Sequence, residues 1–422
     1  MIGTKLLKNM KKYLLIFSIL ILAFVVRFYN FSNRVTFGPE QARSLVVSSE
    51  YINDKPSLLG QEYFRTNSLG QKLFTSAIFN YSLVPLIFIF KYQPLPITLY
   101  FAFLNIITAI VFYFVVKKIF NIKLAAISFT LFVFSYLMIY HSMFIWVLNY
   151  LPLVGILTFY LLYKVVKGKS SWKDIFLLGV LSGIGFGLEY LYVLTILIVL
   201  YVLFKYSKEK LKTLSVFLIG AVVGDLPQVL FDLKHNFYHL KTLWQYTLDT
   251  FRGVSDAGFT YYHFLHFWPL VILAISYLVY IVIQKNKHLG ILLIVIYIIV
   301  NLNSSLINFN KPVGMSEGLN LTKLIKTSKI IAEKSSNNFN IVTLYDFDTR
   351  GYTLRYLTKY IFNKTPMGIL DYPSSPEIFS LAENNYNFKG SVPWELTFLK
   401  PYNIEVIEKI GDDFSLYKIT KK

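Results

Sequence analysis

The 422-residue sequence contains no cysteine. Disulfides, zinc–thiolate sites and cysteine nucleophiles are therefore excluded. The sequence also lacks a P-loop, a G-x-S-x-G nucleophile motif, an H-E-x-x-H metal motif and a Rossmann glycine pattern. These absences argue against an ATP-driven pump and against a membrane protease.

Charged residues are scarce, at 15% of the chain compared with about 25% in an ordinary soluble domain. Hydrophobic residues make up 55%, and the mean hydropathy is +0.52. A soluble fold of this length cannot bury so much apolar surface, and a disordered chain has the opposite composition. The composition therefore predicts a multi-pass membrane protein in contact with membrane lipids.

The net charge of +19 is unevenly distributed. The first 303 residues hold 27 Lys and Arg but only 11 Asp and Glu, whereas the remaining 119 hold 15 and 12. Much of the excess lies in short lysine-rich loops between apolar runs, at 117–123, 164–173, 205–212 and 285–288. This is the positive-inside pattern of a cytoplasmic-membrane protein, and we expect no nucleic-acid partner.

We predict nine membrane spans, with the N-terminus in the cytoplasm and the C-terminus outside. A further apolar stretch at 73–90 is not counted, because a crossing there would move all four lysine-rich loops outside. Asn80 and Pro85 also make it a poor lipid-exposed span. The nine runs lie at about 13–29, 97–116, 124–140, 151–166, 174–190, 191–205, 213–231, 264–284 and 288–304.

This topology predicts two domains. Residues 1–304 form the membrane domain, whose first outer loop (about 31–96) carries interfacial helices. Residues 305–422 form an extracytoplasmic α/β domain. Within the latter, 339–346 is typical of a buried strand, 349–362 of an amphipathic helix, and IEVIEKI and FSLYKIT of strands around a turn at 412–413.

Nine of the 11 acidic residues in the first 303 lie outside or near the outer interface in this topology, so an active site is expected on the outer face. They are Glu40, Glu50, Asp54, Glu62, Glu189, Asp225, Asp232, Asp249 and Asp256.

Glu40 is the leading candidate for a catalytic carboxylate. Pro39 is suited to the first turn of a helix over 40–53, and Arg43 then lies one turn after Glu40. The alternative interpretation is a solvated residue in a first helical turn, where the helix dipole favours an acid.

A second candidate site lies at 224–241, where Pro227 kinks or ends a span. Asp232, Lys234 and His235 then gather at the outer interface, where cations suit a phosphate head group. The alternative is a collar of snorkelling basic residues.

The weaker candidates each have a structural alternative. Glu189 lies at a tight turn between two spans. It is either a functional carboxylate or a turn residue that reaches interfacial water. Asn149 and Trp146 lie in a short outer link that an aromatic belt would also explain. Asp346, Asp348 and Arg350 are typical of a strand-end turn with a helix cap. We interpret His141, His263 and His266 as interfacial anchors.

Four segments resemble a known group of membrane enzymes. The chain is similar to bacterial GT-C glycosyltransferases, the superfamily of protein O-mannosyltransferases and lipid A aminoarabinose transferase. The nearest likeness is to a branch with an F-x-x-D-Q-x-R-D motif in the first outer loop. The segments are FGPEQARS (37–44), WVLNYLP (146–152), LPQVLFDLKHNF (226–237) and NIVTLYDFDTRGYTLRYL (340–357).

This resemblance implies an α-helical polytopic GT-C fold and a hexosyl- or pentosyltransferase of the cell envelope. The donor would be a polyprenyl-phosphate sugar, and the acceptor a glycan, a lipid or a protein. Glu40 would act as the general base or help to hold a divalent metal, with Gln41 beside it in the motif. Lys234, His235 and Arg43 would bind the donor phosphate.

Two alternatives to an active transferase stay open. A flippase or transporter of lipid-linked sugars would share the phosphate site, but it needs polar groups in the middle of the membrane. An inactive GT-C-like scaffold is the other alternative, because Glu40 stands where the motif has Asp and Ser44 where it has a second acid.

Overall fold

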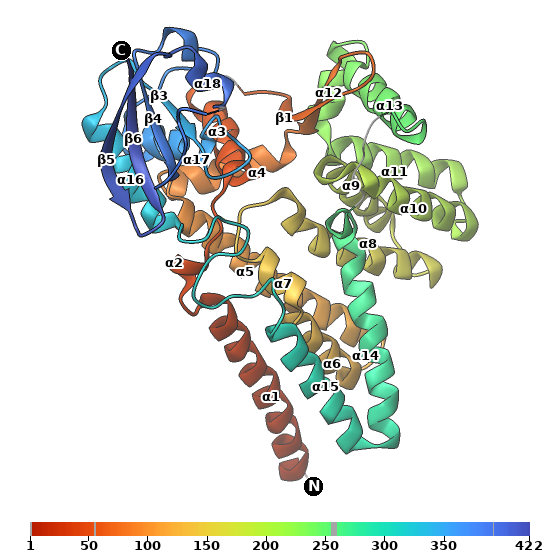
Figure 1. Cartoon of the computed structure of the whole chain (residues 1–422). Helices are drawn as coiled ribbons and strands as arrows, with labels where there is room; N and C mark the ends of the chain where they lie inside the picture. The colour runs from red at the N-terminus through yellow and green to blue at the C-terminus, as the bar shows by residue number, and fades with distance from the viewer. Residues whose placement is uncertain (1, 55, 255–259, 391) are drawn as a thin grey trace.

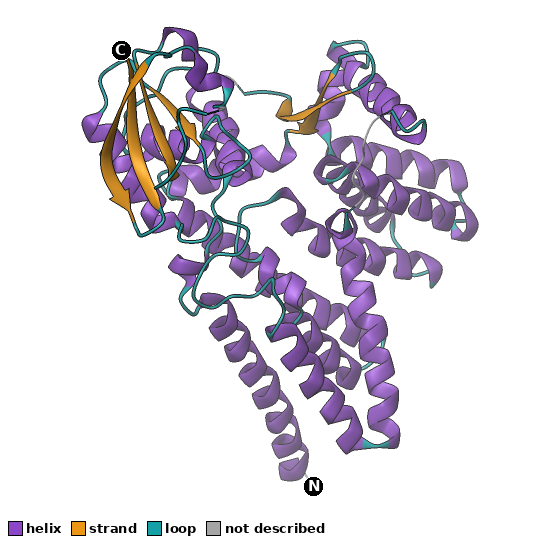
Figure 2. Cartoon of the chain, viewed as in Figure 1, coloured by secondary structure: helices purple, strands orange, loops and turns teal. Residues whose placement is uncertain are grey.

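The computed structural model describes residues 2–54, 56–254, 260–390 and 392–422. Most of the chain is helical, and a small sheet lies at one end of the molecule (Figure 1, Figure 2). The prediction of a helical polytopic protein with a small C-terminal sheet domain is confirmed.

Helices occupy every apolar run of the sequence. In Figure 1, α1, α5, α6, α14 and α15 extend toward the end of the molecule opposite the sheet, and α8 to α11 lie beside them. The bounds are α1 (Ile2–Phe28), α5 (Pro94–Ile119), α6 (Ile122–Val133), α7 (Tyr136–His141), α8 (Leu151–Val166), α9 (Trp172–Leu188), α10 (Val193–Tyr206), α11 (Lys210–Gly224), α14 (Trp268–Lys285) and α15 (Lys287–Leu302).

Fewer of the described helices are long enough to cross a bilayer than the nine spans predicted. Within the described residues, three helical stretches are long and apolar enough to cross a bilayer: Pro94–Ile119, Val147–Val166 and Tyr261–Lys285. A fourth is obtained if α11 and α12 (Leu226–Lys234), which meet at an angle of 89°, count as one. The apolar part of α1 at Ile16–Phe28 and the remaining apolar helices are shorter; α6, with 12 residues, is only about 18 Å long. The bend before Pro227 agrees with the predicted kink.

Glycines allow α9 and α11 to pack at backbone distance. A Cβ atom placed on Gly183 would lie 2.1 Å from the carbonyl oxygen of Ala221, and one on Gly220 would lie 2.2 Å from that of Phe176. Gly179 and Gly224 make the same kind of contact, so each helix carries a pair of glycines four residues apart. This is the small-residue packing typical of helices in membranes.

The first outer loop begins with α2 (Phe31–Arg34) and α3 (Pro39–Asn53) and continues into a β-hairpin. The helix predicted at 40–53 is therefore confirmed. The hairpin, β1 (Leu59–Thr66) and β2 (Lys72–Ser76), was not predicted. The stretch 73–90 holds β2 and then α4 (Ile78–Ile89), whose 12 residues are too few for a membrane crossing.

The C-terminal part folds around a four-stranded sheet of order β3-β4-β6-β5. β3 and β4 are parallel, whereas β6 pairs antiparallel with both β4 and β5. The strands predicted at 339–346, 404–410 and 414–420 are confirmed. The bounds are α16 (Leu321–Lys334), β3 (Asn340–Thr343), α17 (Tyr352–Tyr356), β4 (Glu377–Glu383), α18 (Trp394–Thr397), β5 (Tyr402–Ile410) and β6 (Phe414–Lys421).

The segment after α15 interlocks with the start of the first outer loop. Arg34 donates to the carbonyl of Asn308 at 2.9 Å, and the Thr36 hydroxyl donates to that of Val313 at 2.6 Å. Farther out, Tyr356 of α17 donates to the carbonyl of Tyr92 at 2.7 Å. These bonds hold the C-terminal part against α2 and the turn that follows α4.

The glycine contact between α9 and α11 predicts a sharp difference between two substitutions on α11. We expect Gly220→Val to destabilise the protein by about 1–3 kcal/mol, because the added side chain would collide with the backbone of α9. Ser215→Val, on the exposed side of the same helix, should change stability little. Thermal unfolding in detergent measures both, and equal losses would contradict the assigned packing.

Candidate functional site

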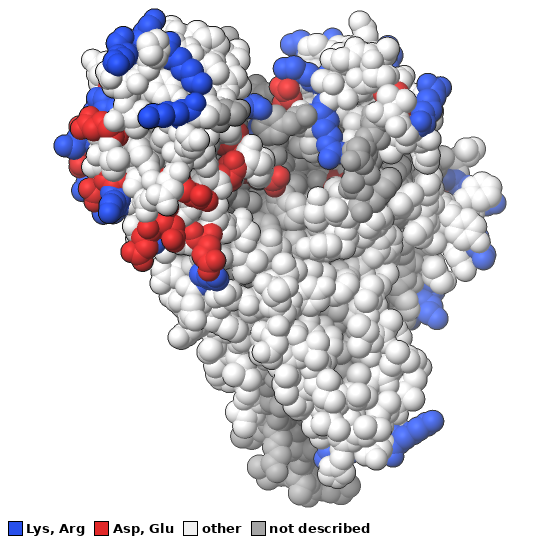
Figure 3. Space-filling model, in the orientation of Figure 1, with Lys and Arg blue, Asp and Glu red and all other residues white. Residues whose placement is uncertain are grey.

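A cavity of about 200 Å³ lies where the first outer loop, the ends of several helices and the C-terminal part meet. In Figure 3 the surface is hollowed between the sheet domain and the lobe that contains α12 and α13 (Tyr238–Phe251), and red acidic atoms lie around the hollow. The cavity is lined by Pro39, Glu40, Arg43, Gln61, Glu62, Tyr63, Thr75, Trp146, Val147, Leu148, Leu188, Glu189, Tyr262, His263, Phe347, Asp348 and Tyr352.

Glu40 lies in the first turn of α3, as predicted. Pro39 occupies the start of the helix, and the side chain of Gln41 accepts a hydrogen bond from the N–H of Gly38 at 2.9 Å. Gln41 is buried and thus caps the helix rather than lining the cavity. The Glu40 side chain is exposed to solvent, but protein surrounds the cavity that it lines. This partial burial raises the pKa of the Glu40 carboxyl, and the nearby Arg43 opposes the shift.

Arg43 joins three elements around the cavity. It lies one turn after Glu40 on α3, and its guanidinium donates to the backbone carbonyl of Glu62 on β1. Its Cζ also lies 5.9 Å from the centre of the Tyr352 ring on α17. The side chain therefore presents a positive charge to the cavity while it ties α3 to the hairpin and to the C-terminal part.

Glu189 and His263 form a hydrogen-bonded pair in the same cavity. Glu189 follows the end of α9, and its Oε1 accepts from the N–H of Leu191 at 3.2 Å. His263 lies in a short 3₁₀ segment before α14, and its Nδ1 is 2.8 Å from Glu189 Oε2. Their side chains are 11% and 24% exposed, respectively. His263 was predicted to be only an interfacial anchor, so its pairing with Glu189 was not foreseen.

Four carboxylates, those of Glu40, Glu62, Glu189 and Asp348, line the cavity. Glu62 pairs with Lys72 at 3.2 Å. On the C-terminal side, burial raises the pKa of Asp348, so its proton is held more tightly than in an ordinary Asp.

A divalent metal at Glu40 was one implication of the resemblance. Among the residues that the structure describes, no three His, Asp or Glu side chains are grouped so that they could hold a metal ion. Because Mg²⁺ usually binds through one or two carboxylates and the phosphates of a substrate, a divalent metal at Glu40 stays a prediction.

Lys234 and His235 do not line the cavity. Both are exposed, where α12 ends. The His235 ring stacks on Phe231 with 4.1 Å between centroids, and its Nδ1 lies 2.9 Å from the Phe231 carbonyl. The neighbouring Asp232 is buried and accepts from the N–H of His239 at 2.8 Å, which caps α13.

The remaining candidates have structural partners. Asn149 does not line the cavity and donates to the carbonyl of Phe144 at 2.7 Å. Trp146 lines the cavity and stacks on His141 at 5.3 Å. Asp348 accepts from the N–H of Tyr352 at 3.4 Å, in agreement with the predicted turn and cap, yet it also faces the cavity. Asp256 lies outside the described residues.

A buried polar network supports the cavity from behind the hairpin. Tyr190, next to Glu189, donates to the carbonyl of Phe74 on β2 at 2.7 Å, and His239 Nε2 lies 3.0 Å from the same oxygen. Ser76, at the end of β2, donates to Asp225 at 2.6 Å. These bonds fix β2 against α9 and α13, and thereby the position of the β1 residues that line the cavity.

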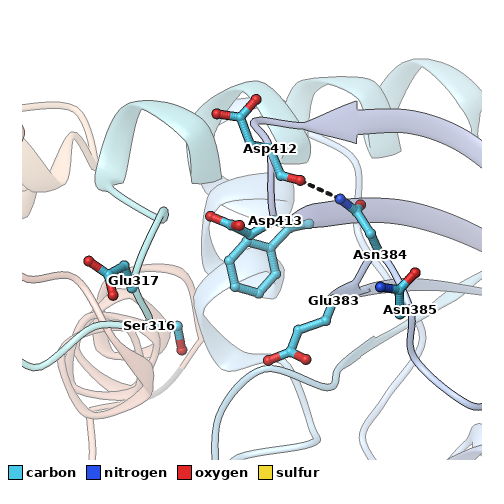
Figure 4. A pocket seen from close by; sticks show the side chains of 8 residues that line it. Ser316, Glu317, Glu383, Asn384, Asn385, Asp412 and Asp413 are labelled. Atoms are coloured by element: carbon cyan, nitrogen blue, oxygen red, sulfur yellow. Dashed lines mark hydrogen bonds between the residues drawn. The ribbon is translucent and has the colours of Figure 1, made fainter.

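A second hollow lies in the C-terminal part (Figure 4). It is rimmed by the acidic side chains of Glu317, Glu383, Asp412 and Asp413, all of which are exposed to solvent. Figure 4 shows the amide of Asn384 bonded to the backbone carbonyl of Asp412. We interpret this rim as a solvated acidic surface.

Comparison with known proteins gives a fold and a partial family match. Residues 78–226 match the family described as dolichyl-phosphate-mannose-protein mannosyltransferase. The whole chain is similar to crystal structures of ArnT from Cupriavidus metallidurans, one bound to undecaprenyl phosphate and one in the apo state. No curated protein matches the sequence.

The predicted likeness to protein O-mannosyltransferases and lipid A aminoarabinose transferase is confirmed for residues 78–226 and for the fold, respectively. The TM-scores to the two ArnT structures are 0.61 and 0.60, at 10% identity, over 96% of this chain and 97% of theirs. This likeness establishes the GT-C fold. The family match begins after FGPEQARS (37–44), so membership in the branch with the D-Q-x-R-D motif stays a prediction.

Proposed function

We propose that the protein is a GT-C glycosyltransferase that moves a sugar from a polyprenyl phosphate to an acceptor in the cavity at Glu40. The observation that carries this proposal is the convergence of Glu40, Arg43 and Glu189 in one cavity next to the membrane helices. The family match and the ArnT fold support it, and one of the ArnT structures holds undecaprenyl phosphate. The lysine-rich loops favour the outer face of the cytoplasmic membrane as the site of transfer.

Glu40 is the proposed general base. An acceptor hydroxyl gives its proton to the Glu40 carboxylate while its oxygen bonds to the anomeric carbon of the donor sugar. The bond from that carbon to the phosphate oxygen breaks, and the electron pair leaves with the polyprenyl phosphate. The leaving phosphate gains one negative charge, and Arg43 is the cation that lines the cavity and can stabilise it.

The geometry favours Arg43 over Lys234 and His235 as the phosphate partner, because those two side chains are exposed outside the cavity lining. Their position at the end of α12, beside the exposed side chains of Leu230 and Leu233, suits contact with lipid head groups. The flippase alternative predicts movement of the lipid-linked sugar across a bilayer without transfer.

Glu40→Gln should lower sugar transfer by about a hundredfold or more, because a neutral amide cannot take the acceptor proton. Transfer from radiolabelled polyprenyl-phosphate sugars in proteoliposomes measures this. Glu50→Gln is the matched control on the same helix, since burial also raises the pKa of Glu50 but Glu50 does not line the cavity. Undiminished transfer by Glu40→Gln would reject the proposed base. Lipid movement without transfer by the wild type would favour the flippase.

The pH dependence of transfer should carry the signature of Glu40. Its carboxyl pKa is raised above the ordinary value of 4.5, and only the ionised form accepts a proton. We therefore expect kcat/KM to fall as the pH is lowered through this raised pKa. Arg43 opposes the shift, so Arg43→Gln should move the acid limb to still higher pH. An acid limb that Arg43→Gln leaves in place would contradict the assignment.

Arg43→Gln should also raise the KM for the donor by about tenfold, the loss of one charge-assisted hydrogen bond. Lys234→Gln combined with His235→Gln should have a smaller effect, confined to weaker association with anionic lipid. Steady-state kinetics in nanodiscs with and without anionic lipid separates the two. A larger KM effect from the double variant would restore the phosphate role that the sequence motif implies.

A further inference from the structure

The pair Glu189–His263 has the geometry of an oriented imidazole that faces substrate. Both oxygens of Glu189 are engaged, one by the N–H of Leu191 at 3.2 Å and the other by His263 Nδ1 at 2.8 Å. A carboxylate only accepts hydrogen bonds, so in a neutral imidazole ring the proton must lie on Nδ1. The other ring nitrogen, Nε2, then carries a lone pair that points away from Glu189.

The Nε2 edge is the part of His263 that remains available. His263 lines the cavity, and its side chain is 24% exposed. Within the described part of the chain, the set of buried polar atoms without a hydrogen-bond partner does not include its Nε2. The ring is packed against Tyr262 with 4.5 Å between centroids, and Tyr262 in turn packs edge-on to Trp146 at 5.0 Å. Aromatic neighbours on one side and Glu189 on another restrict rotation of the imidazole.

The side chains of Glu189 and His263 are less exposed to solvent than that of Glu40. Glu40 is exposed to solvent, whereas the side chains of Glu189 and His263 are only 11% and 24% exposed. An acceptor that arrives from solvent meets Glu40 first. The inner part of the cavity, around His263, is left for the sugar that the donor carries.

We propose that His263 Nε2 accepts a hydrogen bond from a hydroxyl of the donor sugar, and that Glu189 is a positioning residue that holds His263 in the required tautomer. The partner is thus a polyhydroxylated sugar ring on a lipid phosphate. This inference rests on the proposed function for its donor, but the affinity for such a donor can be measured without turnover.

The ring lends itself to three informative variants. His263→Asn keeps an amide near the Nδ1 position and can still donate to Glu189, but it has no atom at the Nε2 position. The amide of His263→Gln reaches the Nε2 position. Glu189→Gln must use its oxygen for the Leu191 N–H, so its amide nitrogen faces Nδ1. The ring proton then moves to Nε2, which becomes a donor.

The experiment is equilibrium binding of farnesyl phosphate and of its hexosyl and pentosyl derivatives to purified protein. We expect the wild type to bind one glycosylated probe more tightly than farnesyl phosphate. His263→Asn should remove about tenfold of that preference, the value of one hydrogen bond, and leave binding of farnesyl phosphate unchanged. His263→Gln should restore part of the preference, and Glu189→Gln should weaken it, because the hydroxyl must then accept from Nε2 instead of donating to it. His288→Asn, an exposed histidine, is the matched control.

The outcomes are distinct. No preference for any glycosylated probe in the wild type would overturn the inference, as would equal losses from His263→Asn and His263→Gln. A parallel loss of farnesyl phosphate binding or of thermal stability in His263→Asn would assign His263 a structural role and would also overturn it. A His263-dependent preference without sugar transfer would support the sugar contact and reject the transferase proposal.

Discussion

The packing of α3 against α17 holds the site together, because the cavity takes one wall from each side of that contact. Phe37, just before α3, and Tyr356 of α17 are both completely buried, and their rings lie 6.0 Å apart. Arg43 extends from α3 over the Tyr352 ring of α17. Without this contact Glu40 and Asp348 would belong to separate surfaces. The buried aromatic pair stabilises this contact, and Arg43 presents a positive charge to a mainly acidic cavity.

Several of the few acidic residues in the first 303 positions lie together at the cavity. Glu40, Glu62 and Glu189 come from α3, β1 and the end of α9, and all three line one cavity. Two of the three have a partner, since Lys72 pairs with Glu62 and His263 with Glu189, and burial raises the pKa of the Glu40 carboxyl. Acids gathered beside apolar helices are typical of functional sites in membrane proteins, and this supports the proposed site.

Local patterns predicted the parts of the fold that depend on local physics. Apolar runs predicted the helices, and short runs beside a turn predicted the C-terminal strands. Pro39 with Glu40 predicted the start of α3. Fewer described helices are long enough to cross a bilayer than the nine spans predicted, because hydropathy does not register every break in a helix, such as the one between α6 and α7. The hairpin was missed although Gly70, with a φ of +72°, lies in its turn. His263 was missed for a different reason: it is 74 residues away from Glu189, and only the tertiary fold brings the two together.

The direction of α12 explains why Lys234 and His235 lie apart from the cavity although their motif suggests a phosphate site. The 89° bend between α11 and α12 turns the basic end of α12 to the surface. The carboxylate of the buried Asp232 caps α13. A phosphate in the cavity would then face Arg43 as its cation, with Glu40 one helical turn away. The negative charges of such a phosphate and of an ionised Glu40 would repel each other. The raised pKa of the Glu40 carboxyl would therefore affect binding of the donor. In the proposed mechanism, the protonated form of Glu40 would admit an anionic donor more readily, and the ionised form would act as the base. Burial that raises the pKa of the Glu40 carboxyl would then favour entry of the donor and would lower the fraction of Glu40 that is ionised at a given pH.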